Sequence, residues 1–399
     1  MSDAHITHVT GGAYGLEATY AAVRRLADAF DSAGSELRDW AGLGARTMLD
    51  PDLVASAPLA PASFTVAEAA VVAATTGPDG VLVESVSWEE DAIVARTVVA
   101  AFDACDEEVQ AWFQPLTERA IAFTEPQRRS GLLALAYGGD GHPGVRPLRV
   151  HVPYSHDQPS DLAGLVRQLE HVAALSSGPD SAMNGTVEVQ TIHGPDGVRH
   201  IVYLPGTDDM TTLPWTQDHD VRDLPTDLLL MSGQDNSYQQ GILDAMAQAG
   251  VGRHEPVLLV GHSMGGMEAV AILGHGSDFD VTHVVTAGSP TAQVPVFPTG
   301  THVLSLEHLG DVVPLTDGAP NPDSVQQTTV TFADDGGAGG VVGNHDYWHY
   351  LNGAAAADAS TDPSVQEQLA SLHEGGFLAT GDGPPTTVTS QVFQIVREP

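Results

Sequence analysis

The stretch Pro256-Val257-Leu258-Leu259-Val260-Gly261-His262-Ser263-Met264-Gly265-Gly266 decides the fold. Its first half is a short apolar run typical of a buried strand, and the small residues that continue to Leu273 are typical of a closely packed helix. Ser263 stands at the junction, with a glycine two positions before it and another two positions after it. A serine hydroxyl is a weak nucleophile at neutral pH, so an enzyme that uses one holds it on a strained strand-to-helix turn beside a base. The pattern predicts that Ser263 is a catalytic nucleophile; a plain turn with a surface serine is the alternative.

Strand-like and helix-like patterns alternate on both sides of this stretch. Helices are predicted at 161–175, 238–249 and 264–273, and apolar runs suggest strands at 186–192, 198–204, 227–231, 256–260, 281–287, 302–306 and 328–332. This order predicts an α/β fold with a mostly parallel sheet and helices on both faces. Reactive groups are then expected at the carboxyl ends of the strands.

The first part of the chain has a different pattern. Apolar residues recur at three- and four-residue steps over 14–40 and over 88–112, as one face of a long helix requires, and a shorter alanine-rich helix is predicted at 67–74. We therefore expect residues 1–150 to form an α-helical accessory domain and residues 151–399 to form the catalytic domain.

The triplet Trp40-Ala41-Gly42 follows the first predicted helix. It is similar to the Trp-x-Gly turn of the small helical-hairpin proteins that type VII secretion systems export. A plain helical domain that packs on the catalytic half or forms a homodimer remains the preferred interpretation. A secretion-associated effector, whose helical half binds a partner, is the alternative.

The charge of the chain limits its partners. Fifty-two acidic residues stand against fifteen basic ones, all of them arginine, and the formal net charge is -37. Such a protein repels nucleic acid, and the charge is best explained by solubility. Cys105 is the only cysteine, which excludes an intramolecular disulfide and a zinc site built from several cysteines.

Hydropathy indicates a protein without a membrane span. Hydrophobic residues make up 42% of the chain, and no apolar run approaches the roughly 20 residues that a bilayer requires. Residues 1–12 lack the basic segment and apolar run of a conventional signal peptide. We expect a cytoplasmic location, or export by another route.

The strand that ends at Leu204 leads into Pro205-Gly206-Thr207, a candidate oxyanion loop. The tetrahedral intermediate of acyl transfer carries negative charge on the former carbonyl oxygen, and two backbone N–H groups must meet it. We expect these donors to be Thr207 and Met264, the residue after the nucleophile. An ordinary strand-to-loop turn is the alternative.

A catalytic histidine needs a carboxylate that fixes its tautomer. Asp311 follows a predicted strand and is the preferred acid, with Asp317 as a rival on the same loop. Asp280 precedes a strand and therefore belongs to the wrong edge of the sheet.

The base is expected last in the order serine, acid, histidine. His345 stands at a loop-to-helix junction after a glycine-rich segment, and His349 lies four residues further on. We prefer His345 as the base. The spacing of the two histidines would also suit a metal on a helix, but no third ligand is evident, so we expect no metal.

Two further residues are candidates for contact with substrate. His262 adjoins the nucleophile and is expected to form a wall of the site rather than to act as the base. Trp215 lies in the segment 208–224, which carries apolar residues among acidic ones and could be a lid, an acyl-binding wall or an ordinary surface loop.

Together these segments resemble the α/β-hydrolase superfamily. The resemblance rests on Gly206-Thr207, Gly261 to Gly266, Gly310-Asp311-Val312-Val313-Pro314 and His345 with Tyr347 and Tyr350. The Gly-Thr segment and the Asp-x-Val-Pro loop are similar to those of the class 3 lipases and related esterases, over roughly residues 185–360. The resemblance implies an esterase, lipase or phospholipase that uses Ser263, Asp311 and His345, without metal or organic cofactor, on a small-molecule or lipid ester through an acyl-enzyme. A catalytically inactive binding domain of the same fold is a further alternative.

Overall fold

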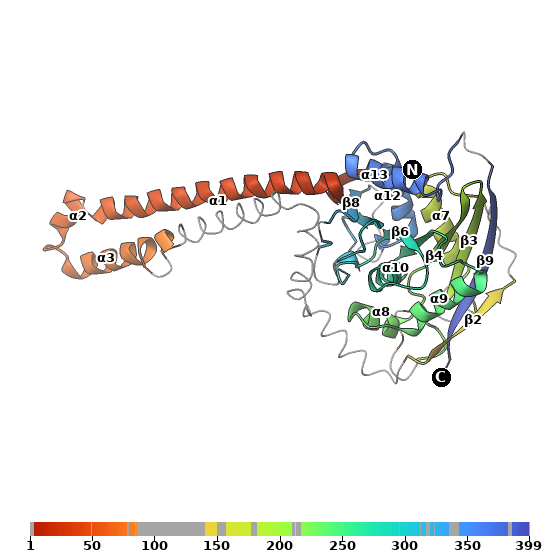
Figure 1. Ribbon diagram of the computed structural model, residues 1–399. Helices are drawn as coiled ribbons and strands as arrows, with labels where there is room; N and C mark the ends of the chain where they lie inside the picture. The colour runs from red at the N-terminus through yellow and green to blue at the C-terminus, as the bar shows by residue number, and fades with distance from the viewer. Residues whose placement is uncertain are drawn as a thin grey trace. The chain divides into compact units, whose positions relative to one another are not determined.

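The computed structural model describes residues 4–48, 50–77, 80–83, 85, 140–149, 157–176, 182–209, 212, 217–294, 296–311, 313–316, 320–322, 324–334, 343–381 and 385–398. The chain divides into two compact units (Figure 1). One consists of Met1–Leu16 together with Thr117–Pro399, and the other of Glu17–Leu116. The first of these units holds the central sheet.

Nine strands form this sheet in the order β1-β8-β7-β6-β5-β4-β3-β9-β2. The five central strands, β4 to β8, run parallel, and the strands outside them pair antiparallel. Their bounds are β1 (His5–Gly11), β2 (His142–Leu148), β3 (Thr186–Gly194), β4 (Gly197–Leu204), β5 (Val257–His262), β6 (Val281–Ala287), β7 (His302–His308), β8 (Gln327–Ala333) and β9 (Thr387–Glu398). The predicted α/β fold with a mostly parallel central sheet is confirmed.

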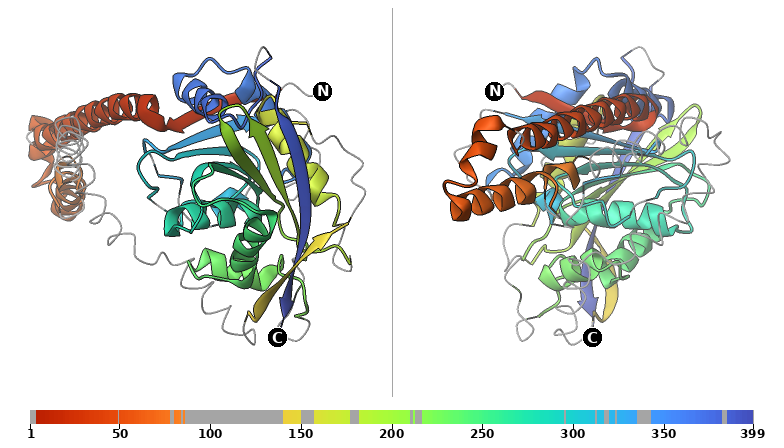
Figure 2. Two further views of the ribbon diagram at one scale, coloured as in Figure 1. Left: turned by 45° about the vertical axis from the view of Figure 1, so that its right-hand side comes forward. Right: turned by 90° about the vertical axis from the view of Figure 1, so that its left-hand side faces the viewer.

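Helices cover both faces of the sheet (Figure 2). Side chains of α8 (Leu224–Met231), α9 (Ser237–Ala249) and α10 (Met264–His275) join one buried apolar cluster. Side chains of α7 (Leu162–Ala173), α12 (Tyr347–Asp358) and α13 (Pro363–Glu374) join the other. Because the central strands are buried on both faces, they read as nearly continuous apolar runs rather than as alternating ones.

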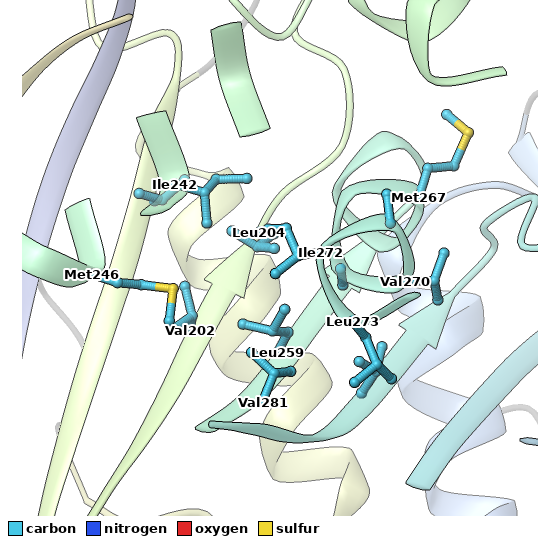
Figure 3. Packing of buried hydrophobic residues seen from close by; sticks show 14 of the residues in the cluster. Val202, Leu204, Ile242, Met246, Leu259, Met267, Val270, Ile272, Leu273 and Val281 are labelled. Carbon is cyan, nitrogen blue, oxygen red and sulfur yellow. The ribbon is translucent and has the colours of Figure 1, made fainter. Parts of the chain in front are cut away.

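Figure 3 shows the first cluster. Val202 and Leu204 of β4 point toward Ile242 and Met246 of α9, and Leu259 of β5 points toward α10. All five side chains are completely buried. This packing fixes α9 and α10 against the strands whose carboxyl ends carry the site.

One predicted strand is a helix. The run Asp227-Leu228-Leu229-Leu230-Met231 belongs to α8, so its assignment to a strand is wrong. The Oδ1 atom of Asp223 accepts the N–H of Thr226 at 3.3 Å, and Pro225 occupies the first turn. A side-chain cap followed by proline starts a helix, and this local signal outweighs the apolar run.

Before β2, the described residues form the helices α1 (Gly12–Met48), α2 (Pro51–Ser56) and α3 (Pro61–Thr75). The predicted helices at 14–40 and 67–74 are therefore present. The helix α1 runs through Trp40-Ala41-Gly42, so the predicted turn at this triplet is wrong. The second apolar stripe at 88–112 and Cys105 lie outside the described residues. Among the helices that are described, none combines the length and the apolar character needed to cross a bilayer.

Both ends of the range 1–150 contribute to the sheet. The strand β1 pairs with β8 at one edge, and β2 pairs with β9 at the other. The second compact unit is Glu17–Leu116, so β1 and β2 belong to the unit that holds the sheet and not to it. Most residues of β1 and β2 are exposed or half-buried, so these two strands lack the apolar run that marks a buried strand.

Candidate active site

Ser263 occupies a strained turn between β5 and α10. Its φ of 53° and ψ of -123° are the only positive-φ conformation of a non-glycine residue in the described chain. A Cβ atom on Gly265 would lie 1.9 Å from the carbonyl oxygen of Leu204, and one on Gly261 would lie 2.3 Å from the carbonyl oxygen of Gly265. Strand and helix therefore cross so closely that only glycine fits at these two positions. A residue held in such a conformation costs about 1–3 kcal/mol, and such strain clusters at functional sites.

The carboxylate of Asp311 lies just beyond the end of β7. Its side chain is buried, and its Oδ1 atom accepts the N–H of Val313 at 2.9 Å. Its Oδ2 atom lies 2.6 Å from Nδ1 of His345, which precedes α12. Asn344 donates its side-chain N–H to the carbonyl oxygen of Gly310 at 2.9 Å, so the two loops are joined directly. The structure thus brings together the acid and the base that the sequence suggests.

The rival acids differ in position. Asp280 precedes β6, where its carbonyl oxygen accepts the N–H of Val257, at the amino end of the parallel strands. Asp317 lies outside the described residues.

His262 connects the turn at Ser263 to the loop of His345. Its Nε2 atom lies 3.0 Å from the carbonyl oxygen of His345, and the two rings are 4.5 Å apart between centroids. The ring of Tyr347 packs at 4.1 Å on the same imidazole. Burial lowers the pKa of His262 well below its ordinary value, with a further contribution from the neighbouring His345. His262 is therefore a neutral ring whose Nε2–H donates to the carbonyl oxygen of His345, which favours a structural role over that of general base.

The rival base, His349, is bound elsewhere. Its Nδ1 atom lies 2.8 Å from Oδ1 of Asp334, and Nε2 of His308 lies 3.4 Å from the same oxygen. In the described part of the chain, these three residues form a group that could hold a metal ion. Gly310 donates its N–H to Nδ1 of His308 at 3.2 Å, and burial lowers the pKa of that ring. The neutral ring then carries its proton on Nε2, the atom that a metal would need.

The candidate oxyanion loop at Gly206 and Thr207 lies beside the turn that carries Ser263. A Cβ atom on Gly206 would come within 3.0 Å of the Cβ atom of Ser263. Gly206 donates its N–H to Oη of Tyr347, and Asp208 donates its N–H to the carbonyl oxygen of Arg222. Between them, the N–H of Thr207 meets no acceptor among the described residues.

Met264 supplies the second candidate donor. It is the first residue of α10, and the first N–H groups of a helix have no partner within the helix. The helix dipole also favours negative charge at this end. The side-chain hydroxyl of Thr207 is already used, because it donates to Oδ2 of Asp227 at 2.8 Å.

A buried ion pair that no sequence motif indicates supports the candidate oxyanion loop. Arg222 is completely buried, and its Nη2 atom lies 2.7 Å from Oδ2 of Asp208. Its Nη1 atom donates to the carbonyl oxygen of Gly206 at 3.0 Å. The same carboxylate accepts the hydroxyl of Ser176 and the N–H of Gly185, both at 2.9 Å. The loop that carries Thr207 is therefore held on both sides of that residue.

Trp215, the second candidate for substrate contact, lies outside the described residues. Both ends of its segment are described and anchored: Asp209 bridges to Asp223, and Asp220 bridges to Val396 of β9. The interpretation of the intervening residues as a lid remains a prediction.

The comparisons with known proteins agree with this geometry at the level of the superfamily. Residues 235–352 match the PGAP1-like alpha/beta domain, a family of α/β-hydrolase type, and this range includes Ser263, Asp311 and His345. No match was found among the curated proteins or the solved structures. The narrower likeness to class 3 lipases gains no support from the matched family. The chain thus carries an α/β-hydrolase-type domain that is similar to the PGAP1-like alpha/beta domain.

Proposed function

We propose that the protein is a serine hydrolase that cleaves carboxylic esters of lipase or esterase type. The observation that carries the proposal is that the His345–Asp311 pair and the turn of Ser263 are linked through His262, the residue before that serine. Ser263 lies on a strained turn. Nδ1 of His345 lies 2.6 Å from Oδ2 of Asp311, and the carbonyl oxygen of His345 accepts a hydrogen bond from His262. Nothing in this arrangement calls for a metal or an organic cofactor.

The hydrogen bonds determine which nitrogen acts as the base. Asp311 accepts the Nδ1 proton of His345, which leaves the lone pair of Nε2 available for the hydroxyl proton of Ser263. The serine oxygen attacks the ester carbonyl, and the oxyanion is met by the N–H groups of Thr207 and Met264. The imidazolium then gives its proton to the departing alcohol. Water cleaves the acyl-enzyme by the same route and regenerates the serine.

Each part of this machinery has a characteristic size of effect. A positioned proton transfer contributes about 100- to 10,000-fold in rate, and one oxyanion donor about 100- to 1,000-fold. Because the members of a triad act as a unit, removing the nucleophile should cost about as much as removing the whole triad.

Labelling with a fluorophosphonate probe tests whether the hydroxyl of Ser263 is activated. Wild-type protein should be labelled at Ser263 and should hydrolyse p-nitrophenyl butyrate. Ser263→Ala should lose both the label and at least about 10,000-fold of the turnover while keeping its circular dichroism spectrum. The control is Ser277→Ala, on the loop beyond the other end of α10, which should behave as wild type.

Near-normal hydrolysis by Ser263→Ala would refute the assignment. A folded wild-type protein that takes no label would favour the inactive binding domain instead. A partner or homodimer contact through the helical residues remains a prediction, which sedimentation velocity of the full chain would test.

A further inference from the structure

A second proton donor contacts the carboxylate that orients the proposed base. Tyr350 lies on α12 and is completely buried. Its Oη atom donates to Oδ2 of Asp311 at 2.5 Å, the same oxygen that lies 2.6 Å from Nδ1 of His345. Burial raises the pKa of the phenol well above its ordinary value, and the nearby Asp311 raises it further. The phenol is therefore protonated, and able to donate, at neutral pH.

The surrounding backbone is shaped to admit this phenol. Gly288 follows β6 with a φ of +64°, and a Cβ atom placed there would lie 2.7 Å from Oη of Tyr350. The ring of Phe332 meets that of Tyr350 edge-on at 5.6 Å between centroids. On α12, the position of Gly353 lies so close to Phe332 that a Cβ atom would come within 2.4 Å of its ring. Contacts from two places, Gly288 after β6 and Phe332 of β8, thus hold the ring whose hydroxyl reaches Asp311.

We propose that Tyr350 is a positioning residue that weakens the basicity of Asp311 and thereby keeps His345 neutral, and able to act as a base, at lower pH. The inference rests on the proposed function of the Ser263–His345–Asp311 group. A carboxylate that accepts three donors, from His345, Tyr350 and Val313, holds less charge available for the imidazolium than one that accepts two. Removing the phenol hydroxyl should therefore stabilise the protonated form of His345.

Other titratable groups lie around Asp311 and His345, and the test must leave their side chains unchanged. Glu307 and His308 approach from β7, and His262 approaches from β5. Asp334, after β8, reaches the pair through its contact with His308. None of these groups is altered when the phenol oxygen alone is removed.

The experiment is Tyr350→Phe, which keeps the ring and removes only the oxygen. The acid limb of the pH profile of kcat/KM should move up by about 0.5–1 pH unit, because loss of a hydrogen bond to a charged group changes a pKa by an amount of this order. A merely structural role would lower the plateau and leave the limb in place. The control is Tyr203→Phe, in which another buried tyrosine, bonded to Gln190, loses its hydroxyl, and its limb should not move.

A second readout does not need turnover. In a Ser263→Ala background, the imidazole resonances of His345 can be titrated by NMR, and Tyr350→Phe should raise the pKa of His345 by the same amount. An unmoved pKa in a folded variant would overturn the inference, even if ester hydrolysis is confirmed. If the pKa moves but no ester is cleaved and no probe is bound, the inference stands and the proposed function fails.

A variant that does not fold would not end the test. Replacing Tyr350 by 3-fluorotyrosine makes its phenol a stronger donor to Asp311, so the pKa of His345 should then fall. An unchanged or raised pKa in the fluorinated protein would contradict the role of Tyr350.

Discussion

Asp227 carries a buried carboxyl group whose ionisation should lower the stability of the folded protein as the pH rises. The side chain is almost fully buried on α8, where the hydroxyl of Thr207 donates to it. Burial is the main reason that the pKa of Asp227 is raised from 3.8 to about 7; the nearby charge of Asp223 raises it further, while the bond from Thr207 opposes the change. A carboxyl group with a raised pKa in the folded state favours folding only while it is protonated.

The sign and the size of the effect follow from the two pKa values. Below 3.8 the group is protonated in both the unfolded and the folded chain, so it has no effect. Stability is lost as the pH rises above 3.8, and the loss is complete above about 7. At 1.36 kcal/mol for each unit of pKa difference, the full loss is about 4 kcal/mol, and about 2 kcal/mol of it is already present at pH 5.5.

The variant Asp227→Asn removes this penalty and keeps an oxygen for Thr207. Its free energy of unfolding relative to wild type should rise by about 2 kcal/mol between pH 5.5 and pH 8.5. Any constant cost of the new amide cancels in this difference. Urea unfolding followed by circular dichroism measures it, at pH values above the sequence pI of about 4.4.

Asp278→Asn is the control, because the side chain of Asp278 is 71% exposed. Its effect on stability should not vary over the same range. A difference between Asp227→Asn and wild type that stays constant from pH 5.5 to 8.5 would show that the folded and unfolded pKa values of Asp227 do not differ as argued.

Two further predictions concern the loop and the turn of the site. Arg222→Met leaves Asp208 buried without its cation and should lower the unfolding free energy by about 3–5 kcal/mol, which thermal melts measure. Adding Asp208→Asn to this variant removes the unpaired charge and should recover part of the loss. If the double variant is as unstable as the single one, the ion pair is not the cause. Gly265→Ala places a Cβ atom 1.9 Å from the carbonyl oxygen of Leu204 and should prevent folding, as judged by soluble yield, whereas Gly381→Ala meets open space and should behave as wild type. Soluble, active Gly265→Ala protein would show that the crossing of strand and helix is looser than described.

The parts of the site that could be predicted from sequence are those encoded locally. The strand, turn and helix around Ser263 follow from one apolar run and three glycines, and the loop of Asp311 directly follows a predicted strand. His345 could be ranked above His349 because it lies at a loop-to-helix junction. The misassigned strand at 227–231 shows the limit of this reasoning, since a five-residue apolar run has the same pattern in a helix and in a strand.

The parts that could not be predicted depend on contacts between distant residues. Arg222 lies fourteen positions from Asp208, and neither position belongs to a motif. Tyr350 was visible as part of the resemblance, but its bond to Asp311 depends on the space that Gly288 leaves. The strand β9 has no regular alternation of polar and apolar residues, and nothing in its own sequence shows that it pairs with both β3 and β2.

The positions of β1 and β2 determine how the chain could be shortened. These strands close opposite edges of the sheet, and the segment between Gly11 and His142 is the connection from one edge to the other. With about 4.8 Å between neighbouring strands, the connection spans about 38 Å along the sheet. A replacement linker would need at least about 12 extended residues, and removing every residue before His142 would leave β8 paired with β7 alone. A shortened chain would therefore have to keep both edge strands, β1 and β2, and rejoin them through such a linker.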